Sequence, residues 1–234
     1  MTGRMQIRPV AFLWFGFRVG LMLQHTFPVG PFGCNCSIVA DETTKTAIVI
    51  DPGGDFDEIA AVLERDQLRV IAIVHTHTHI DHVGATPALQ RLSGAGAHIH
   101  EADRLLYDML PVQAAMLGVP PVERCDMEGS LNDGAVFPFG AFELGVIHTP
   151  GHTPGSVSFS VSTPQGPLLF SGDTLFRRSI GRTDLWGGDH EQILSSIQHR
   201  LLTLSDETLV IPGHGPQTTI AAERRSNPHL RGLV

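Results

Sequence analysis

The chain has 234 residues, which is enough for a buried core in one domain or in two small ones. Its 16 lysines and arginines against 24 aspartates and glutamates give a formal charge of −8, and the sequence has no basic stripe, which argues against a nucleic-acid partner. The three cysteines form no disulfide framework, so we expect a reducing, cytoplasmic compartment. Small molecules or proteins are the expected partners, and the oligomeric state stays open.

The first twenty residues differ from the rest of the chain. They contain Arg4, Arg8 and Arg18, no acidic residue, and an apolar stretch over residues 10–17. Such a stretch is too short for a membrane span, which needs about 20 residues, and Arg18 interrupts any signal-sequence pattern. An organelle transit peptide is an alternative, but we expect residues 1–20 to be an extension, ordered or not, ahead of a domain over residues 21–234. No other segment of the sequence is long and apolar enough to cross a membrane, so we expect no membrane partner.

From Leu21 onward, short strand patterns alternate with helical ones. In the first half we predict strands over 36–40 and 46–50, a helix over 56–66, a buried strand over 70–74, a helix over 86–92, a strand over 97–100, and a helix over 104–110 capped by Asp103. In the second half we predict strands over 136–137, 142–147, 157–161 and 168–170, a helix over 190–202 and a strand over 208–211. Two strand-rich halves with helices predict an α/β fold of two packed sheets flanked by helices.

The strand predicted at 70–74 leads into a group of polar side chains. Four histidines and an aspartate follow within eight residues, at positions 75, 77, 79, 81 and 82. Burying such rings without partners costs about 1–3 kcal/mol for each unsatisfied group, and a divalent cation removes that cost by binding imidazole and carboxylate. Alternate residues of an extended segment share a side, so His77 and His79 can hold one ion. Asp81 and His82, where the chain turns, could face a second ion.

Three more candidate ligands follow strand-like runs in loops. His152, Asp173 and His214 each stand beside glycine, two of them also beside proline-containing turns that can aim the side chain. The predicted metal ligands are therefore His77, His79, Asp81, His82, His152, Asp173 and His214. We interpret His75 and His148 as structural or supporting residues. Asp51 either supports the metal site or caps a turn.

In this order, the seven residues resemble the signature of the metallo-β-lactamase superfamily, His-x-His-x-Asp-His followed by a later His, Asp and His, from about Met22 to Gly215. The resemblance implies a four-layer αββα sandwich with two divalent ions per chain, zinc first, with iron or manganese as alternatives. It implies that one ion is held by His77, His79 and His152, that the other is held by Asp81, His82 and His214, and that Asp173 bridges both. The lactamases themselves carry a cysteine where this chain has Asp173, which argues against antibiotic hydrolysis.

Within that superfamily, residues 172–176 and 179–184 resemble the short bacterial glyoxalase II-like (hydroxyacylglutathione hydrolase-like) proteins. This resemblance implies hydrolysis of a thioester, S-lactoylglutathione or a related acyl thioester, by a metal-bridging hydroxide that Asp81 orients as the catalytic residue. Arg182 would bind a substrate carboxylate, or else form an ion pair with Asp184. Glutathione itself stays open, because only 19 residues follow Gly215, where full-length glyoxalase II has a helical domain, and Asp184 replaces a tyrosine of that group.

The main alternative is an oxidoreductase. Persulfide dioxygenases resemble this chain in the His-x-His-x-Asp-His motif and in the segment 181–184, and they use a single iron, whose ligands here would be His77, His152 and Asp173. A lactonase, a phosphodiesterase and a metal-dependent binding module are weaker alternatives. We interpret the three cysteines and Tyr107 as packing residues, and the Arg177-Arg178 pair as either a basic rim of the site or a solvated pair.

Overall fold

The computed structural model describes residues 20–233, so the extension predicted over residues 1–20 lies, apart from Gly20, outside the described residues. Five strands form the first sheet in the order β1-β2-β3-β4-β5. Their bounds are Met22–Val29, Cys34–Asp41, Thr46–Ile50, Arg69–Val74 and Gly96–His98. Strands β1 to β3 pair antiparallel, whereas β3, β4 and β5 run parallel.

The second sheet has six strands in the order β13-β12-β9-β8-β7-β6. In chain order, β6 to β9 span Val136–Phe139, Phe142–His148, Val157–Thr163 and Gly166–Gly172, and β12 and β13 span Leu209–Pro212 and Thr218–Thr219. Strands β9 and β12 are parallel neighbours, and the other pairs are antiparallel. A short hairpin, β10 (Leu175–Phe176) with β11 (Ser179–Ile180), follows β9.

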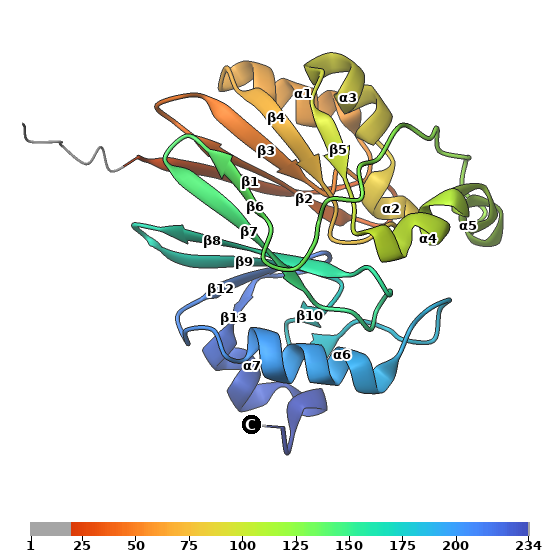
Figure 1. Cartoon of the computed structure of the whole chain (residues 1–234), viewed down its shortest axis with the longest axis vertical. Coiled ribbons are helices and arrows are strands. Elements are labelled where there is room, and N and C mark those ends of the chain that lie inside the picture. Colours follow the sequence, from red (N-terminus) through yellow and green to blue (C-terminus); the bar gives the residue numbers. More distant parts are fainter. Residues whose placement is uncertain (1–19, 234) are drawn as a thin grey trace, which may run out of the picture.

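Helices cover the outer faces of both sheets, as Figure 1 shows: α1 (Phe56–Arg65) and α3 (Thr86–Ser93) lie over the first sheet, and α6 (His190–Ser196) and α7 (Ile220–Ser226) lie over the second. The short helices α2 (Ile80–Val83), α4 (Arg104–Asp108) and α5 (Leu110–Leu117) lie together at one end of the sandwich. The predicted αββα sandwich is therefore confirmed. None of the helices within residues 20–233 combines the length and the apolar character that crossing a membrane requires.

The alternation of side chains along β3 explains the layers. Ile48 and Ile50 point into the core between the two sheets, where they meet residues such as Phe159 of β8. Val49 points the other way, toward α1 and its Ile59. Because both faces of this strand are covered, it is apolar throughout, as is typical of strands between two layers. A third cluster joins the second sheet to α6 and α7.

Every predicted strand and helix is present, the strand over 46–50 with its predicted ends, but the structure corrects three details. The helix predicted over 190–202 is α-helical over His190–Ser196 and continues as a π-helix over Ile197–Leu201. The helix predicted over 104–110 is α4 and ends at Asp108, because the ring of Pro111 fits the first turn of a new helix, α5, but not the interior of a continuing one. Asp103 occupies the N-cap position of α4, as predicted, but its side chain makes no capping hydrogen bond. The strands β1, β10, β11 and β13 and the helices α2, α5 and α7 were not predicted, because they are short or lie at an edge of a sheet.

Candidate metal centre

The seven predicted donors come from four segments that lie far apart in the sequence and meet at one edge of the sandwich. Residues 77 and 79 follow β4, residues 81 and 82 lie on α2, residue 152 lies between β7 and β8, residue 173 follows β9 and residue 214 follows β12. Each segment begins where a strand ends, and strand ends are where loops bring polar groups together on a rigid scaffold. The donor atoms form overlapping groups whose members lie within 4.8 Å of one another.

Three imidazoles form the first group. The Nδ1 atom of His79 lies 3.0 Å from Nε2 of His77 and 3.0 Å from Nε2 of His152. Nitrogens bound at about 2.0–2.1 Å to one tetrahedral ion lie about 3.3 Å from each other. The three nitrogens are therefore close to the spacing that a single divalent ion requires.

The second group combines two imidazoles with a carboxylate. The Nε2 atoms of His82 and His214 lie 3.3 Å apart, and Oδ2 of Asp81 lies 3.1 Å from Nε2 of His214. The same oxygen lies 3.8 Å from Nε2 of His82. These three residues can hold a second ion.

Asp173 lies between the two groups. Its Oδ2 is 3.6 Å from Nε2 of His152, and its Oδ1 is 3.6 Å from Nε2 of His82. Oδ1 is buried and has no hydrogen-bond partner among the described residues. Burying a carboxylate oxygen without a hydrogen bond costs free energy unless a cation lies beside it. The arrangement thus fits a pair of divalent ions with Asp173 between them.

A second layer of hydrogen bonds sets the orientation of the rings. Thr76 Oγ1 donates to Asp51 Oδ2 at 2.6 Å, so the same hydroxyl accepts from Nδ1 of His77 at 3.1 Å. Asp51 Oδ2 also accepts from Nδ1 of His82 at 3.0 Å, and the Arg182 carbonyl accepts from Nδ1 of His152 at 2.7 Å. Each ring therefore turns its Nε2 toward the cluster. Asp51 therefore supports the site, which is one of the two roles predicted for it.

Burial sets the charge state of the donors. Desolvation lowers the pKa of His77 well below its ordinary value and lowers that of His79 to about 3, and neighbouring imidazoles add to both effects. Burial opposes ionisation of Asp81, but His82 and His214 beside it hold the pKa of that carboxyl below its usual range. At neutral pH the set thus offers neutral rings at His77 and His79 and a charged carboxylate, the forms that bind metal.

Asp103 connects two of the donor segments, a role that the sequence analysis missed. Its Oδ2 accepts hydrogen bonds from Thr78 N at 3.1 Å and from Thr153 Oγ1 at 2.9 Å, and its Oδ1 accepts one from Gly155 N at 2.6 Å. The side chain is fully buried. Asp103 therefore fixes the backbone beside His77 and His79 to the loop of His152.

Close packing around Asp173 requires glycine at position 213. A Cβ atom there would collide with Oδ1 of Asp173 and crowd Cε1 of His82. The loop of His214 is also tied to the first sheet, because Asn35 donates from Nδ2 to the carbonyl of Pro212 at 2.9 Å. Small residues and backbone contacts thus bring the donors of the second sheet against those of the first.

The remaining candidates lie around the cluster rather than in it. The Arg182 guanidinium makes two hydrogen bonds to Asp184, at 2.7 and 2.9 Å, and both side chains are more than half exposed.

His75 bonds to His98 O and Thr86 Oγ1, and His148 bonds to Pro154 O, so both are structural. Tyr107 is buried and bonded to Cys125, as a packing residue would be, while Arg177 and Arg178 are exposed.

Cys34 is closer to the cluster than expected. Its Sγ lies 3.5 Å from Nδ1 of His82, behind the ring. Burial raises the pKa of this thiol to about 12, so it is uncharged at neutral pH. Nothing in the sequence around Cys34 indicated this contact, because it depends on the pairing of β2 with the loop of His214.

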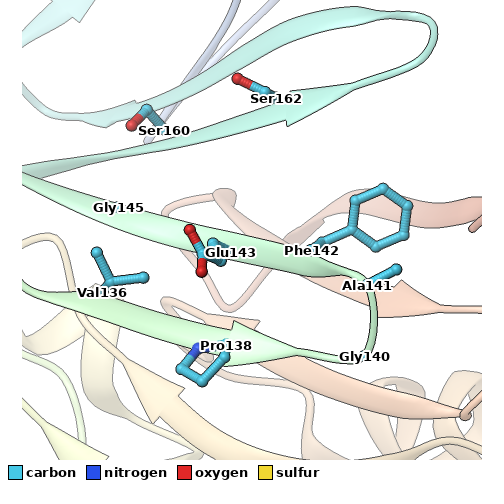
Figure 2. A pocket seen from close by; sticks show the side chains of 9 residues that line it. All are labelled: Val136, Pro138, Gly140, Ala141, Phe142, Glu143, Gly145, Ser160 and Ser162. Atoms are coloured by element: carbon cyan, nitrogen blue, oxygen red, sulfur yellow. The ribbon is translucent and has the colours of Figure 1, made fainter. Parts of the chain in front are cut away.

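A hollow of about 450 Å³ lies elsewhere, on the outer face of β6, β7 and β8 (Figure 2). Its wall includes Glu143, Ser160 and Ser162, which alternate along their strands with the core residues Leu144 and Phe159. None of the seven donors lines it. We therefore assign no part of the metal chemistry to this hollow.

Comparison with known proteins agrees with this geometry. The family model of the Metallo-beta-lactamase superfamily matches residues 29–214. Hydroxyacylglutathione hydrolase GloC from Haemophilus influenzae is 39% identical over 207 residues, which cover 87% of this chain and 95% of the relative.

Three solved structures are also similar. BLEG-1, named as a B3 metallo-beta-lactamase, has a TM-score of 0.80 at 38% identity and covers 90% of this chain and 100% of its own. TTHA1623, solved in a di-iron-bound form, has a TM-score of 0.78 at 38% identity, covering 87% and 98%. ETHE1 from Myxococcus xanthus has a TM-score of 0.68 at 28% identity, covering 88% and 83%.

Proposed function

Because the chain belongs to the metallo-β-lactamase superfamily, as a metal-dependent hydrolase, we propose that it cleaves a thioester. The proposed substrate is S-lactoylglutathione or a related acyl thioester. The similarity to GloC supports this choice, since that relative is named as a hydroxyacylglutathione hydrolase. We propose zinc as the metal, with iron or manganese as alternatives.

The observation that carries the proposal is the position of Asp173. Its Oδ2 lies between the two groups of donors, 3.6 Å from Nε2 of His152 and 3.8 Å from Nε2 of His214. Its Oδ1, 3.6 Å from Nε2 of His82, is buried without a hydrogen-bond partner among residues 20–233. We assign one ion to His77, His79 and His152, the other to Asp81, His82 and His214, and the bridge between them to Asp173. Two ions bound side by side are typical of enzymes that activate water against an acyl or phosphoryl group.

When bound, such ions supply the Lewis acidity that makes water a nucleophile near neutral pH and that polarises a carbonyl. The residues of this chain would hold the ions and orient the reacting groups. Asp81 is the proposed catalytic residue, because its carboxylate is held ionised and can accept a hydrogen bond from the attacking water. Asp51 and Thr76 hold the rings of His77 and His82 in one tautomer. Arg182 remains the proposed contact for a substrate carboxylate, which would compete with Asp184 for the guanidinium.

A second candidate function is the single-iron persulfide dioxygenase. The similarity to ETHE1 keeps it open, and the three residues expected as iron ligands, His77, His152 and Asp173, lie together in the cluster. A third imidazole, His79, lies 3.0 Å from both rings. Because the dioxygenases share the whole His-x-His-x-Asp-His motif, this residue does not separate the two functions, and the number of bound ions does.

Metal analysis combined with a substrate panel separates these functions. We expect protein purified without added metal to carry, or to take up on titration, two ions per chain and to cleave S-lactoylglutathione or another acyl thioester. One iron per chain with oxygen consumption on glutathione persulfide would instead identify the dioxygenase. The panel includes a lactone and a phosphodiester, and also a β-lactam, because BLEG-1 shares 38% identity with this chain. Cleavage of one of these three without thioester cleavage would contradict the proposal.

A further inference from the structure

An apolar groove of about 120 Å³ lies next to the candidate metal centre, with His79 in its wall. Its other walls come from α4, α5, the Met109 junction between them, and the Leu185-Trp186 segment that follows β11. The residues that line the groove are spread along the sequence from His79 to Trp186, much as the metal donors are spread along it. The groove therefore forms only in the folded chain and opens beside the first group of imidazoles.

The one amide in the wall has its hydrogen-bonding groups engaged. Gln113 accepts from Ile80 N at 2.9 Å through Oε1, and its Nε2 donates to Leu106 O at 2.9 Å and to Thr78 O at 3.3 Å. These bonds bind α5 to the backbone of the donor segment. Apart from His79, the groove consequently offers a ligand only apolar side-chain surface.

Helix α5 is apolar on its exposed side as well. It carries no charged residue between Leu110 and Leu117. Met116 is 79% exposed, Val112 is 48% exposed, and Trp186 across the groove is 47% exposed. A helix at a protein surface normally has a polar outer face, and a contiguous exposed apolar patch marks a surface that binds something.

We propose that this groove binds the acyl group of the thioester, and that the preferred substrates are thioesters of apolar acids. The inference rests on the proposed function and narrows it. A carbonyl placed at the metal centre would direct its acyl chain past His79 into the groove. Glutathione, with two carboxylates and an ammonium group, would leave charges without partners there, so the thiol side lies outside the groove. The hydroxyl of a lactoyl group would find no partner in the wall either.

The apolar wall favours each methylene group that enters the groove. Burial of one methylene group contributes about a fourfold increase in binding. We expect kcat/KM to rise about fourfold per methylene from acetyl to butyryl.

The first experiment varies the two halves of the substrate separately on metal-loaded, full-length protein. One series holds glutathione constant and changes the acyl group from acetyl through propionyl, butyryl and hexanoyl, with lactoyl included. The other holds butyryl constant and changes the thiol from glutathione to N-acetylcysteamine. The inference predicts a steep first series with lactoyl below butyryl. A flat acyl series, or a preference set by the thiol alone, would overturn it.

A binding measurement separates failure of this inference from failure of the proposed function. S-butylglutathione and S-methylglutathione are thioethers that cannot be hydrolysed, and Trp186 reports on the groove by fluorescence in a Trp14→Phe background. We expect S-butylglutathione to bind about 50-fold more tightly than S-methylglutathione, from three extra methylenes. If no thioester is cleaved, the proposed function fails, and equal binding of the two thioethers would then overturn the groove assignment as well.

Variants at exposed positions test the groove without disturbing the core. Val112→Ser and Met116→Ser change exposed side chains of the groove, and Leu92→Ser changes a leucine of α3 that is 58% exposed and outside it. We expect both groove variants to lower the butyryl-to-acetyl ratio of kcat/KM about tenfold, and the control to leave this ratio unchanged. Should Val112→Asp turn a dimer into a monomer in light scattering with that ratio unchanged, the groove is an interface between copies and the inference is wrong.

Discussion

The donor cluster and the apolar groove share His79 but are held in different ways. In the cluster, His77 and His82 are buried, and their outer nitrogens bond to Thr76 and Asp51. In the groove, Val112, Met116 and Trp186 are exposed. A network of buried hydrogen bonds allows one arrangement and makes any change costly, whereas an exposed apolar wall tolerates exchange. From this difference we expect substitutions in the cluster to alter metal binding and turnover, and substitutions in the groove to alter only the proposed preference for the acyl group.

The largest effect is expected from Asp173→Ala. This variant removes the carboxylate between the two donor groups, so we expect loss of at least one ion and a fall in kcat/KM of about 10³-fold or more, since metal ions contribute several kcal/mol to such reactions. Metal analysis and thioester kinetics on the same sample measure both. Asp108→Ala, at an exposed acid outside the cluster, is the matched control. An Asp173→Ala protein with both ions and full turnover would refute the bridging assignment.

A smaller effect is expected at Asp103, which joins two donor segments. Asp103→Ala leaves the amides of Thr78 and Gly155 and the hydroxyl of Thr153 without their acceptor. At about 1–3 kcal/mol per unsatisfied group, we expect the free energy of unfolding to fall by ~3 kcal/mol or more. Urea unfolding of metal-free protein measures this, with Asp108→Asn as control. A change below ~1 kcal/mol would mean that Asp103 does not hold the segments together.

The pH dependence of stability tests the burial of His75, which lies behind the cluster. Burial lowers the pKa of this ring from 6.5 to about 4. The unfolded ring binds a proton that the folded ring does not. The contribution of His75 to the free energy of unfolding is therefore fully present above pH 6.5 and falls as the pH drops toward 4, by up to ~1.4 kcal/mol per pH unit. Urea unfolding of metal-free protein should show a shallower slope for His75→Gln than for the unchanged chain. Equal slopes in both proteins, with His229→Gln as the exposed control, would contradict the burial.

The smallest effect on stability is expected at the exposed pair Arg182 and Asp184. Arg182→Ala should change the free energy of unfolding by less than ~1 kcal/mol, because exposed ion pairs contribute little. If the guanidinium also binds a substrate carboxylate, KM rises for glutathione thioesters and stays the same for N-acetylcysteamine thioesters, with kcat unchanged. Asp184→Asn, which keeps Arg182, should not raise KM. An unchanged KM for both substrates would leave Arg182 with only its ion pair.

The sandwich and the metal ligands could be predicted from the sequence because each depends on a local pattern of residues. Apolar runs such as residues 46–50 and 70–74 identify buried strands, and alternation along an extended segment places His77 and His79 on one side. Glycine and proline beside His152 and His214 mark the loops that carry the other ligands. These features need no knowledge of which strand pairs with which.

The parts that were missed depend on contacts between distant segments. Asp103 stands before a helix, so a cap was the natural interpretation, but its partners lie 25 to 52 residues further along or back in the chain. Cys34 meets His82 only because β2 pairs beside the loop of His214. The groove likewise requires α5 and Trp186 to face each other. In the sequence, Asp103 looks like a helix cap and Cys34 like a packing residue. Only the fold shows the contacts that they make.

Anomalous diffraction from crystals of the full chain saturated with zinc is the most direct test of the central claim. We expect two peaks roughly 3.5–4 Å apart, as in two-metal hydrolases. Imidazoles 77, 79 and 152 should surround one peak and residues 81, 82 and 214 the other, with a carboxylate oxygen of Asp173 on each. A single peak at full saturation, or two peaks with Asp173 turned away from both, would contradict this assignment of the ligands.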